Sequence, residues 1–175
     1  GYMDPHLFPQ ASILDPTYTF TVPKKQTAAG CADAINHIME QYFCEESSLL
    51  NDGMMEAAFK SLMVNGRKCI ENPEDYTARA EMMLDCTLAC NGIFSLGNSR
   101  SLWPCHGLEH ALSAYYDITH GEGLAIITPR WMKHILNDHT VDRLAKYGVN
   151  VFGLDAAQDR YDIANQAIQA TYDFF

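Results

Sequence analysis

From Thr27 onward, apolar residues recur at three- and four-residue spacing, which is the pattern of amphipathic helices. In the segment 52–70, Met55, Phe59 and Leu62 fall on one helical face, and Asn72-Pro73 is a stop signal. The segment 76–94 is apolar on nearly every side, as expected of a helix in the middle of a bundle. We therefore predict helices over residues 27–45, 52–70, 76–94, 104–116, 122–137, 141–147 and 156–175.

The first 25 residues differ from the rest, because they contain four of the prolines and one short apolar run, Ala11-Ser12-Ile13-Leu14, that suits a single strand. A lone strand cannot make a sheet, so it would have to pair with something outside this chain. We see no internal repeat and no β-hairpin. The predicted fold class is therefore all-α, a helical bundle over 26–175 preceded by a leader over 1–25 that holds a strand remnant.

Length and charge exclude several classes of protein. The chain has 175 residues, which is roughly one domain, and 12 Lys+Arg against 22 Asp+Glu give a net charge of -10. Such a charge repels phosphate backbones, so we expect no nucleic-acid partner. No apolar run approaches the roughly 18 residues of a membrane span. Six cysteines without a Cys-x-x-Cys motif, and no secretory signal, favour the reducing cytoplasm.

The spacing of histidines and carboxylates suggests a metal site. Asp33 and His37 stand four residues apart in a helical segment, so both side chains share one face. His106 and His110 repeat this spacing, and His120 follows in a predicted loop. Three imidazoles and a carboxylate suit Fe²⁺, Zn²⁺, Co²⁺ or Ni²⁺ better than Mg²⁺ or Ca²⁺. Such pairs also arise by chance, so spacing alone leaves open that these are ordinary helix residues.

Three further residues are weaker candidates. Glu40 shares the face of Asp33 and His37, and could be a fifth ligand or could orient a ligand, but a solvated position is at least as compatible with the pattern. Asp85 could also hold a metal ligand in place through a hydrogen bond, but we favour a position on the solvent-exposed stripe of its helix. Cys105 could offer a soft ligand, and we favour a buried thiol.

The remaining candidates receive plainer interpretations. We assign no role to the other histidines, which are His6, His134 and His139. Gly121-Glu122-Gly123 resembles half of a phosphate loop, but a tight turn is the simpler interpretation, since no glycine-rich loop follows a strand. Phe94 and Trp103 could line a substrate pocket, although core packing is the expected role of each.

Three separated motifs in the right order resemble the group III metal-dependent, iron-containing alcohol dehydrogenases, and within them the bacterial NAD(P)H-dependent butanol dehydrogenases. The motifs are GCADAINHIME at 30–40, HGLEH at 106–110, and HGEGLAI at 120–126 with Pro129. The resemblance runs from about residue 11 to residue 175. It implies that Asp33, His37, His106 and His120 coordinate one divalent metal, usually Fe²⁺ and in some members Zn²⁺ or Ni²⁺. His110 then corresponds to a histidine that does not bind metal but lies beside the nicotinamide of NAD or NADP and the substrate.

The resemblance also implies a domain organisation and an activity. The family has an N-terminal dinucleotide-binding domain and a C-terminal helical domain, and this sequence matches the second, so we expect both ends of the family's chain to be absent. The full-length protein would be a homodimer that transfers hydride between NAD(P)H and a short-chain aldehyde or alcohol, whereas this chain alone would be inactive. His110 would exchange the proton, because histidine can donate or accept near neutral pH. Ligand count alone leaves open a metal-dependent hydrolase, and chance spacing leaves open a non-catalytic helical module.

Overall fold

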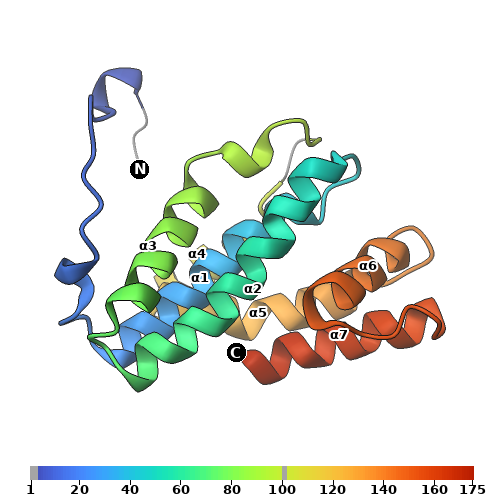
Figure 1. Ribbon diagram of the computed structural model, residues 1–175. Coiled ribbons are helices and arrows are strands. Elements are labelled where there is room, and N and C mark those ends of the chain that lie inside the picture. Colours follow the sequence, from blue (N-terminus) through green and yellow to red (C-terminus); the bar gives the residue numbers. More distant parts are fainter. Residues whose placement is uncertain (1–3, 100–101) are drawn as a thin grey trace.

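The computed structural model describes residues 4–99 and 102–175, and the regular structure of these residues is entirely helical (Figure 1). This confirms the all-α prediction. The α-helices are α1 (Lys24–Tyr42), α2 (Leu49–Glu71), α3 (Tyr76–Cys90), α4 (Pro104–Tyr116), α5 (His120–Ile135), α6 (Val141–Phe152) and α7 (Arg160–Phe174). Short 3-10 helices are η1 (Pro5–Leu7), η2 (Pro16–Thr19) and η3 (Ile93–Ser95).

Local capping residues explain where several helices differ from the predicted ranges. α2 begins earlier than predicted because the Ser48 side chain accepts a hydrogen bond from the Asn51 amide. α3 ends at Cys90 because Gly92 takes a left-handed conformation with φ of 87°, which turns the chain into η3. α6 continues five residues beyond the predicted Tyr147 and ends before Gly153, which has φ of 71°.

Residues 11–14, which suit a strand that pairs outside this chain, form no strand in the part of the chain that the structure describes. These residues have no regular secondary structure, and no other described segment pairs with them. Ile13 is 96% exposed, and the segment runs apart from the bundle in Figure 1. A strand needs a neighbour for its backbone hydrogen bonds, and an apolar run alone does not provide one.

The core is built around α1, which packs against α2, α3, α4 and α5. Ile35, Ile38, Met39 and Tyr42 of this helix are fully buried. Their burial holds one face of α1 rigidly, while the partly exposed Asp33 and His37 lie outside this core cluster. None of the described helices is both long and apolar enough to cross a bilayer.

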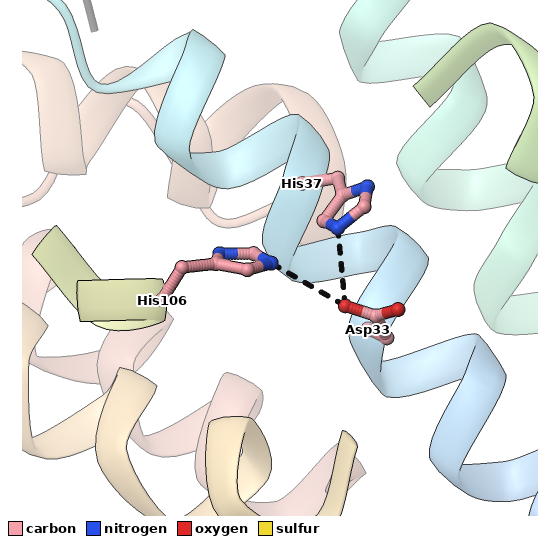
Figure 2. Close-up of side chains that lie close together, drawn as sticks. All are labelled: Asp33, His37 and His106. Atoms are coloured by element: carbon pink, nitrogen blue, oxygen red, sulfur yellow. Dashed lines mark ion pairs between the residues drawn. The ribbon is translucent and has the colours of Figure 1, made fainter. Parts of the chain in front are cut away.

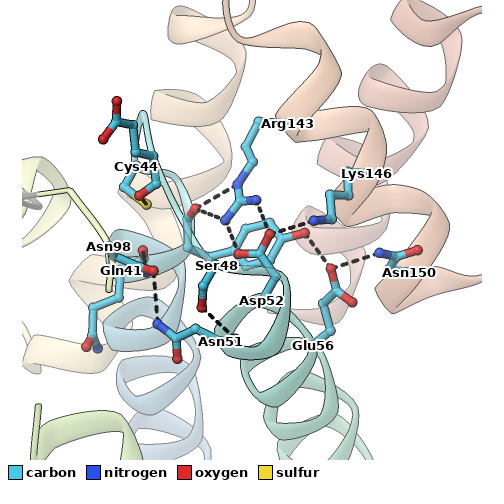
Figure 3. A network of polar contacts seen from close by, with 12 residues as sticks. Gln41, Cys44, Ser48, Asn51, Asp52, Glu56, Asn98, Arg143, Lys146 and Asn150 are labelled. Carbon is cyan, nitrogen blue, oxygen red and sulfur yellow. Dashed lines mark hydrogen bonds and ion pairs between the residues drawn. The ribbon is translucent and has the colours of Figure 1, made fainter. Parts of the chain in front are cut away.

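A buried aspartate connects the α6–α7 hairpin to the rest of the bundle (Figure 3). The Asp52 carboxylate in α2 accepts hydrogen bonds of 2.6 Å from Arg143 and of 2.5 Å from Lys146, both in α6. Arg143 also donates to the Tyr42 carbonyl at the end of α1 over 2.8 Å. Burial opposes ionisation of Asp52, but these cations outweigh it and lower its pKa to about 2. The Asp52 carboxylate and the Arg143 guanidinium together thus join α1, α2 and α6.

Candidate metal centre

Side chains from three helices converge on one oxygen atom. Asp33 and His37 lie one turn apart on α1, His106 is in the first turn of α4, and Figure 2 shows both imidazoles pointing at the Asp33 carboxylate. From Asp33 Oδ1, the distances are 3.2 Å to His37 Nε2, 3.5 Å to His106 Nε2 and 3.5 Å to His120 Nε2. The structure therefore brings together the four residues that the sequence singled out.

This spacing suits donors around a single cation. Ligand atoms at about 2.1 Å from a tetrahedral ion lie about 3.4 Å from one another. Donor atoms of Asp33, His37 and His106 all lie within 4.8 Å of each other, as do those of a second group, Glu109, His110 and His120. The two groups meet at Asp33, because the Nε2 atom of His120 faces its carboxylate.

Two atoms at the centre of the cluster have unsatisfied hydrogen-bonding capacity. Asp33 Oδ1 and His106 Nε2 are buried, and neither has a hydrogen-bond partner among the described residues. Leaving a buried polar atom unpaired costs about 1–3 kcal/mol, so such atoms call for an explanation. A divalent cation would satisfy both atoms, and the residues present fit one.

The charge distribution also favours a cation. Burial opposes ionisation of Asp33, but the imidazoles of His106 and His37 outweigh it and lower its pKa below the ordinary value. Burial likewise disfavours protonated His37, yet the contact with Asp33 raises its pKa to about 10. The first shift keeps Asp33 negatively charged and the second favours a positive charge beside it, so a metal ion could take the place of the histidine proton.

Each histidine of the cluster is held through its other ring nitrogen. Nδ1 of His106 bonds to Glu40, and Nδ1 of His120 bonds to Glu109. Both carboxylates are buried, and Glu40 also accepts from the Cys105 amide. Partners of this kind fix the ring orientation of metal-binding histidines and raise their basicity.

Two glycines allow α5 to begin at the cluster. A Cβ atom at Gly121 would lie 2.0 Å from the carbonyl oxygen of Ala29 in α1, and one at Gly123 would lie 2.6 Å from the Glu109 carboxylate. Only glycine permits this close approach. The tight-turn interpretation is therefore wrong: both glycines are helical, and His120 is the first residue of α5 rather than a loop residue.

Two acidic residues are buried, although the sequence left a solvated position open for Glu40 and favoured one for Asp85. Glu40 is 2% exposed and Asp85 is 6% exposed. The solvated position of Asp85 is wrong because a helix packed on several sides has no solvated stripe. For Glu40, the contact with His106 agrees with the alternative in which it orients a ligand. We assigned no role to Glu109 from the sequence. Its position three residues after His106 and next to His110 was the signal that could have indicated a role at the cluster. Cys105 is a buried thiol, as predicted.

The structure also places the remaining candidates. His110 is exposed, and its ring stacks on His120 with centroids 5.4 Å apart. Trp103 meets His37 edge to face at 5.3 Å, so it lies at the cluster, whereas Phe94 is buried in the core as expected. The exposed histidines without an expected role are His6, His134 and His139.

A family model described as "Fe-containing alcohol dehydrogenase family, C-terminal" matches residues 27–175. The chain belongs to this family. It is 52% identical over 168 residues to NADH-dependent butanol dehydrogenase A of Clostridium acetobutylicum, covering 95% of this chain and 43% of that protein. The chain thus spans less than half the length of the curated relatives it matches.

Solved structures show the same arrangement of helices. NADH-dependent butanol dehydrogenase A from Thermotoga maritima matches with a TM-score of 0.90 and 36% identity, covering 98% of this chain and 42% of that one. The aldehyde reductase YqhD from E. coli, in a substrate- and cofactor-free form, matches with a TM-score of 0.91 and 31% identity, covering 99% and 45%. These likenesses agree with the family and with the all-helical fold.

Proposed function

We propose that Asp33, His37, His106 and His120 bind one divalent metal ion, Fe²⁺ in the first place and otherwise Zn²⁺ or Ni²⁺. The observation that carries this proposal is the approach of three Nε2 atoms to within 3.5 Å of Asp33 Oδ1, where buried donor atoms lack a partner. Three nitrogens and one oxygen form a donor set of intermediate hardness, which suits these metals.

We further propose that the domain serves an alcohol dehydrogenase or aldehyde reductase, which transfers hydride between NAD(P)H and a short-chain aldehyde or alcohol. When bound, the metal supplies the Lewis acidity that polarises the substrate oxygen. The support is family membership, together with relatives whose names state NADH-dependent butanol dehydrogenase or NADPH-dependent aldehyde reductase. Six free cysteines also fit a cytoplasmic enzyme.

In this proposal His110 handles the proton and lies beside the nicotinamide. Its ring is exposed and stacks on His120, so it can exchange a proton with water while remaining next to the donor cluster. Trp103 covers part of the cluster, because it packs edge to face on both His37 and His106 at 5.3 Å and 5.0 Å. Excluding water at this wall would strengthen the electrostatic interactions at the cluster.

Metal binding is tested by titrating the metal-free chain with Zn²⁺ and measuring bound metal by elemental analysis. We expect one equivalent in the wild type and at least a hundredfold weaker binding in Asp33→Ala and in His120→Ala, because each substitution removes a donor. His134→Ala, which changes an exposed histidine of α5, should bind as the wild type does. Equal binding by all four proteins would refute the site.

The activity is tested in the intact protein that carries this sequence, by following butanal-dependent oxidation of NADH and NADPH. We expect metal-dependent oxidation that His110→Ala slows and Asp33→Ala abolishes. A metal-dependent hydrolase would bind the metal but leave the reduced nicotinamide unchanged, so that result would overturn the redox assignment while keeping the site.

A further inference from the structure

The three histidines of the cluster do not have equivalent supporting partners. His106 and His120 are each held by a buried carboxylate, but Nδ1 of His37 contacts the Sγ atom of Cys90 at 2.7 Å. Cys90 is the last residue of α3, 53 positions along the chain from His37, so this contact links α3 to the site. A thiol is a weaker hydrogen-bonding group than a carboxylate.

Ring packing alone cannot orient His37 correctly. Its ring packs against Trp103 at 5.3 Å and against His106 at 4.6 Å, and these contacts limit its tilt. They do not distinguish a nitrogen atom from a carbon atom at the same ring position. A half-turn of the ring about its Cβ–Cγ bond would exchange Nε2 with a carbon and turn Nε2 away from Asp33. The contact of Nδ1 with Cys90 selects the orientation in which Nε2 faces Asp33.

We propose that Cys90 is a positioning residue for His37, and that covalent modification of its thiol weakens metal binding at the cluster. The proposal rests on the metal site proposed above. Unlike Glu40 and Glu109, which are buried, Cys90 is exposed, so reagents in solution can reach this one support of the cluster. The domain would therefore hold its metal less tightly when thiol-reactive electrophiles are present.

Alkylation by iodoacetamide is one such covalent modification of the Cys90 thiol. The Cys90 sulfur forms a bond to the methylene carbon as the carbon–iodine bond breaks, iodide leaves, and the thiol proton passes to solvent. The product is a thioether whose added group crowds the sulfur, so the sulfur can no longer accept the Nδ1–H hydrogen bond at close range. His37 is then free to turn its Nε2 atom away from Asp33.

The first experiment titrates the full chain with Co²⁺ and follows the visible absorption of the bound ion, which reports both affinity and ligand geometry. We expect Cys90→Ala to bind at least tenfold more weakly with an altered spectrum, because partners of metal-binding histidines contribute about 10- to 100-fold to affinity. Cys90→Ser should recover affinity to within about threefold of the wild type, since a hydroxyl can take over the hydrogen bond.

Cys44→Ala is the matched control. Cys44 is partly exposed, and its thiol contacts the Glu46 carbonyl at 3.2 Å rather than a described residue of the cluster. It should bind Co²⁺ as the wild type does. Cys90→Ala binding within twofold of the wild type would overturn the proposal, and so would Cys90→Ser binding as weakly as Cys90→Ala. Circular dichroism and thermal unfolding verify that each variant is folded.

The second experiment needs no substitution at Cys90. In the Cys44→Ala background, iodoacetamide is added to the metal-free folded chain, and mass spectrometry identifies the modified cysteine. We expect carbamidomethylation of Cys90 and at least tenfold weaker Co²⁺ binding. Full modification with unchanged affinity would refute the proposal. Asp33→Ala separates the two hypotheses: if the wild type and Asp33→Ala bind Co²⁺ alike, the metal site itself fails, whereas a failure confined to the Cys90 variants leaves it intact.

Discussion

At the scale of single residues, the carboxylates behind the histidines are as much a part of the cluster as the donors. Glu109 is fully buried, bonds to Nδ1 of His120 and also accepts from the Ser113 hydroxyl. Glu40 plays the same part for His106. The two carboxylates increase the electron density on the imidazoles, so we expect metal affinity to depend on their charge as well as on their position.

Removing one of these charges should weaken the site without removing a donor. We predict that Glu109→Gln lowers Zn²⁺ affinity about tenfold, because the amide keeps the shape of the side chain and loses its negative charge. Glu71→Gln, at an exposed position at the end of α2, should leave affinity unchanged. Competition titration against a coloured chelator measures both values. Equal affinities in the two variants would show that Glu109 does not support His120.

A further buried acid, Asp85, makes stability depend on pH. Burial raises the pKa of Asp85 to about 6, against a weaker opposing hydrogen bond from Ser61. Between about pH 4 and pH 6 the folded chain therefore keeps a proton that the unfolded chain releases, so this group makes stability fall as the pH rises through that window.

The neutral variant should lack this dependence. We predict that Asp85→Asn is about 1–2 kcal/mol more stable than the wild type at pH 8, with the advantage shrinking toward pH 4. Urea unfolding of both proteins at pH 4, 6 and 8 measures the difference. A difference that stays constant over this range would show that Asp85 titrates normally.

At the scale of elements, the geometry of the cluster depends on how closely α5 approaches α1. His120 can face Asp33 only because Gly121 lets the start of α5 lie against the backbone of Ala29. Sequence periodicity identifies both helices, but it contains no information on the distance between them.

Substituting glycines in two helices separates this packing effect from helix propensity. We predict that Gly121→Ala destabilises the chain by about 3 kcal/mol or more, because its Cβ would overlap the Ala29 carbonyl. Gly53→Ala in α2 meets open space and should stabilise by about 0.5–1 kcal/mol. Thermal and urea unfolding give both values. If both substitutions changed the free energy of unfolding in the same direction, the close approach of α5 to α1 would be in doubt.

At the scale of the whole molecule, α6 and α7 are held to the bundle by core packing and by Asp52. This carboxylate joins residues more than 90 positions apart, and the Arg143 guanidinium also stacks on the Tyr42 ring at 3.8 Å. Removing the carboxylate of a buried ion pair leaves its cationic partners uncompensated, which costs more stability than losing an ion pair at the surface.

We therefore expect Asp52→Asn to reduce the free energy of unfolding by about 3 kcal/mol at pH 7. Since the folded pKa of Asp52 is lowered to about 2, the ionised group stabilises the fold above about pH 5, and this contribution is lost as the pH falls toward 2. The gap between variant and wild type should close over that window in urea unfolding.

The control for this prediction is a surface ion pair. Asp142 is 75% exposed and contacts Arg160 at 3.1 Å, so Asp142→Asn should change stability by less than about 1 kcal/mol at any pH. An Asp52→Asn variant no less stable than Asp142→Asn would show that the buried ion pair does not stabilise the fold.

The sequence by itself determined the helices and singled out the candidate donors. Helical periodicity is a local property, so residues 104–116 were predicted as α4 has them, and a four-residue spacing places Asp33 and His37 on one face wherever the helix lies. Resemblance then related His106 and His120 to that pair. These features depend on neighbours along the chain or on short motifs, both of which are visible in the sequence.

Only the tertiary structure decided which residues contact the candidate donors. Glu40, Glu109 and Cys90 acquire their roles from partners 66, 11 and 53 positions away, at distances set by the packing of α1, α3, α4 and α5. The burial of Asp85 has the same origin. Burial and ring orientation depend on all the surfaces that meet at a residue, and the pattern along one helix records only one of them.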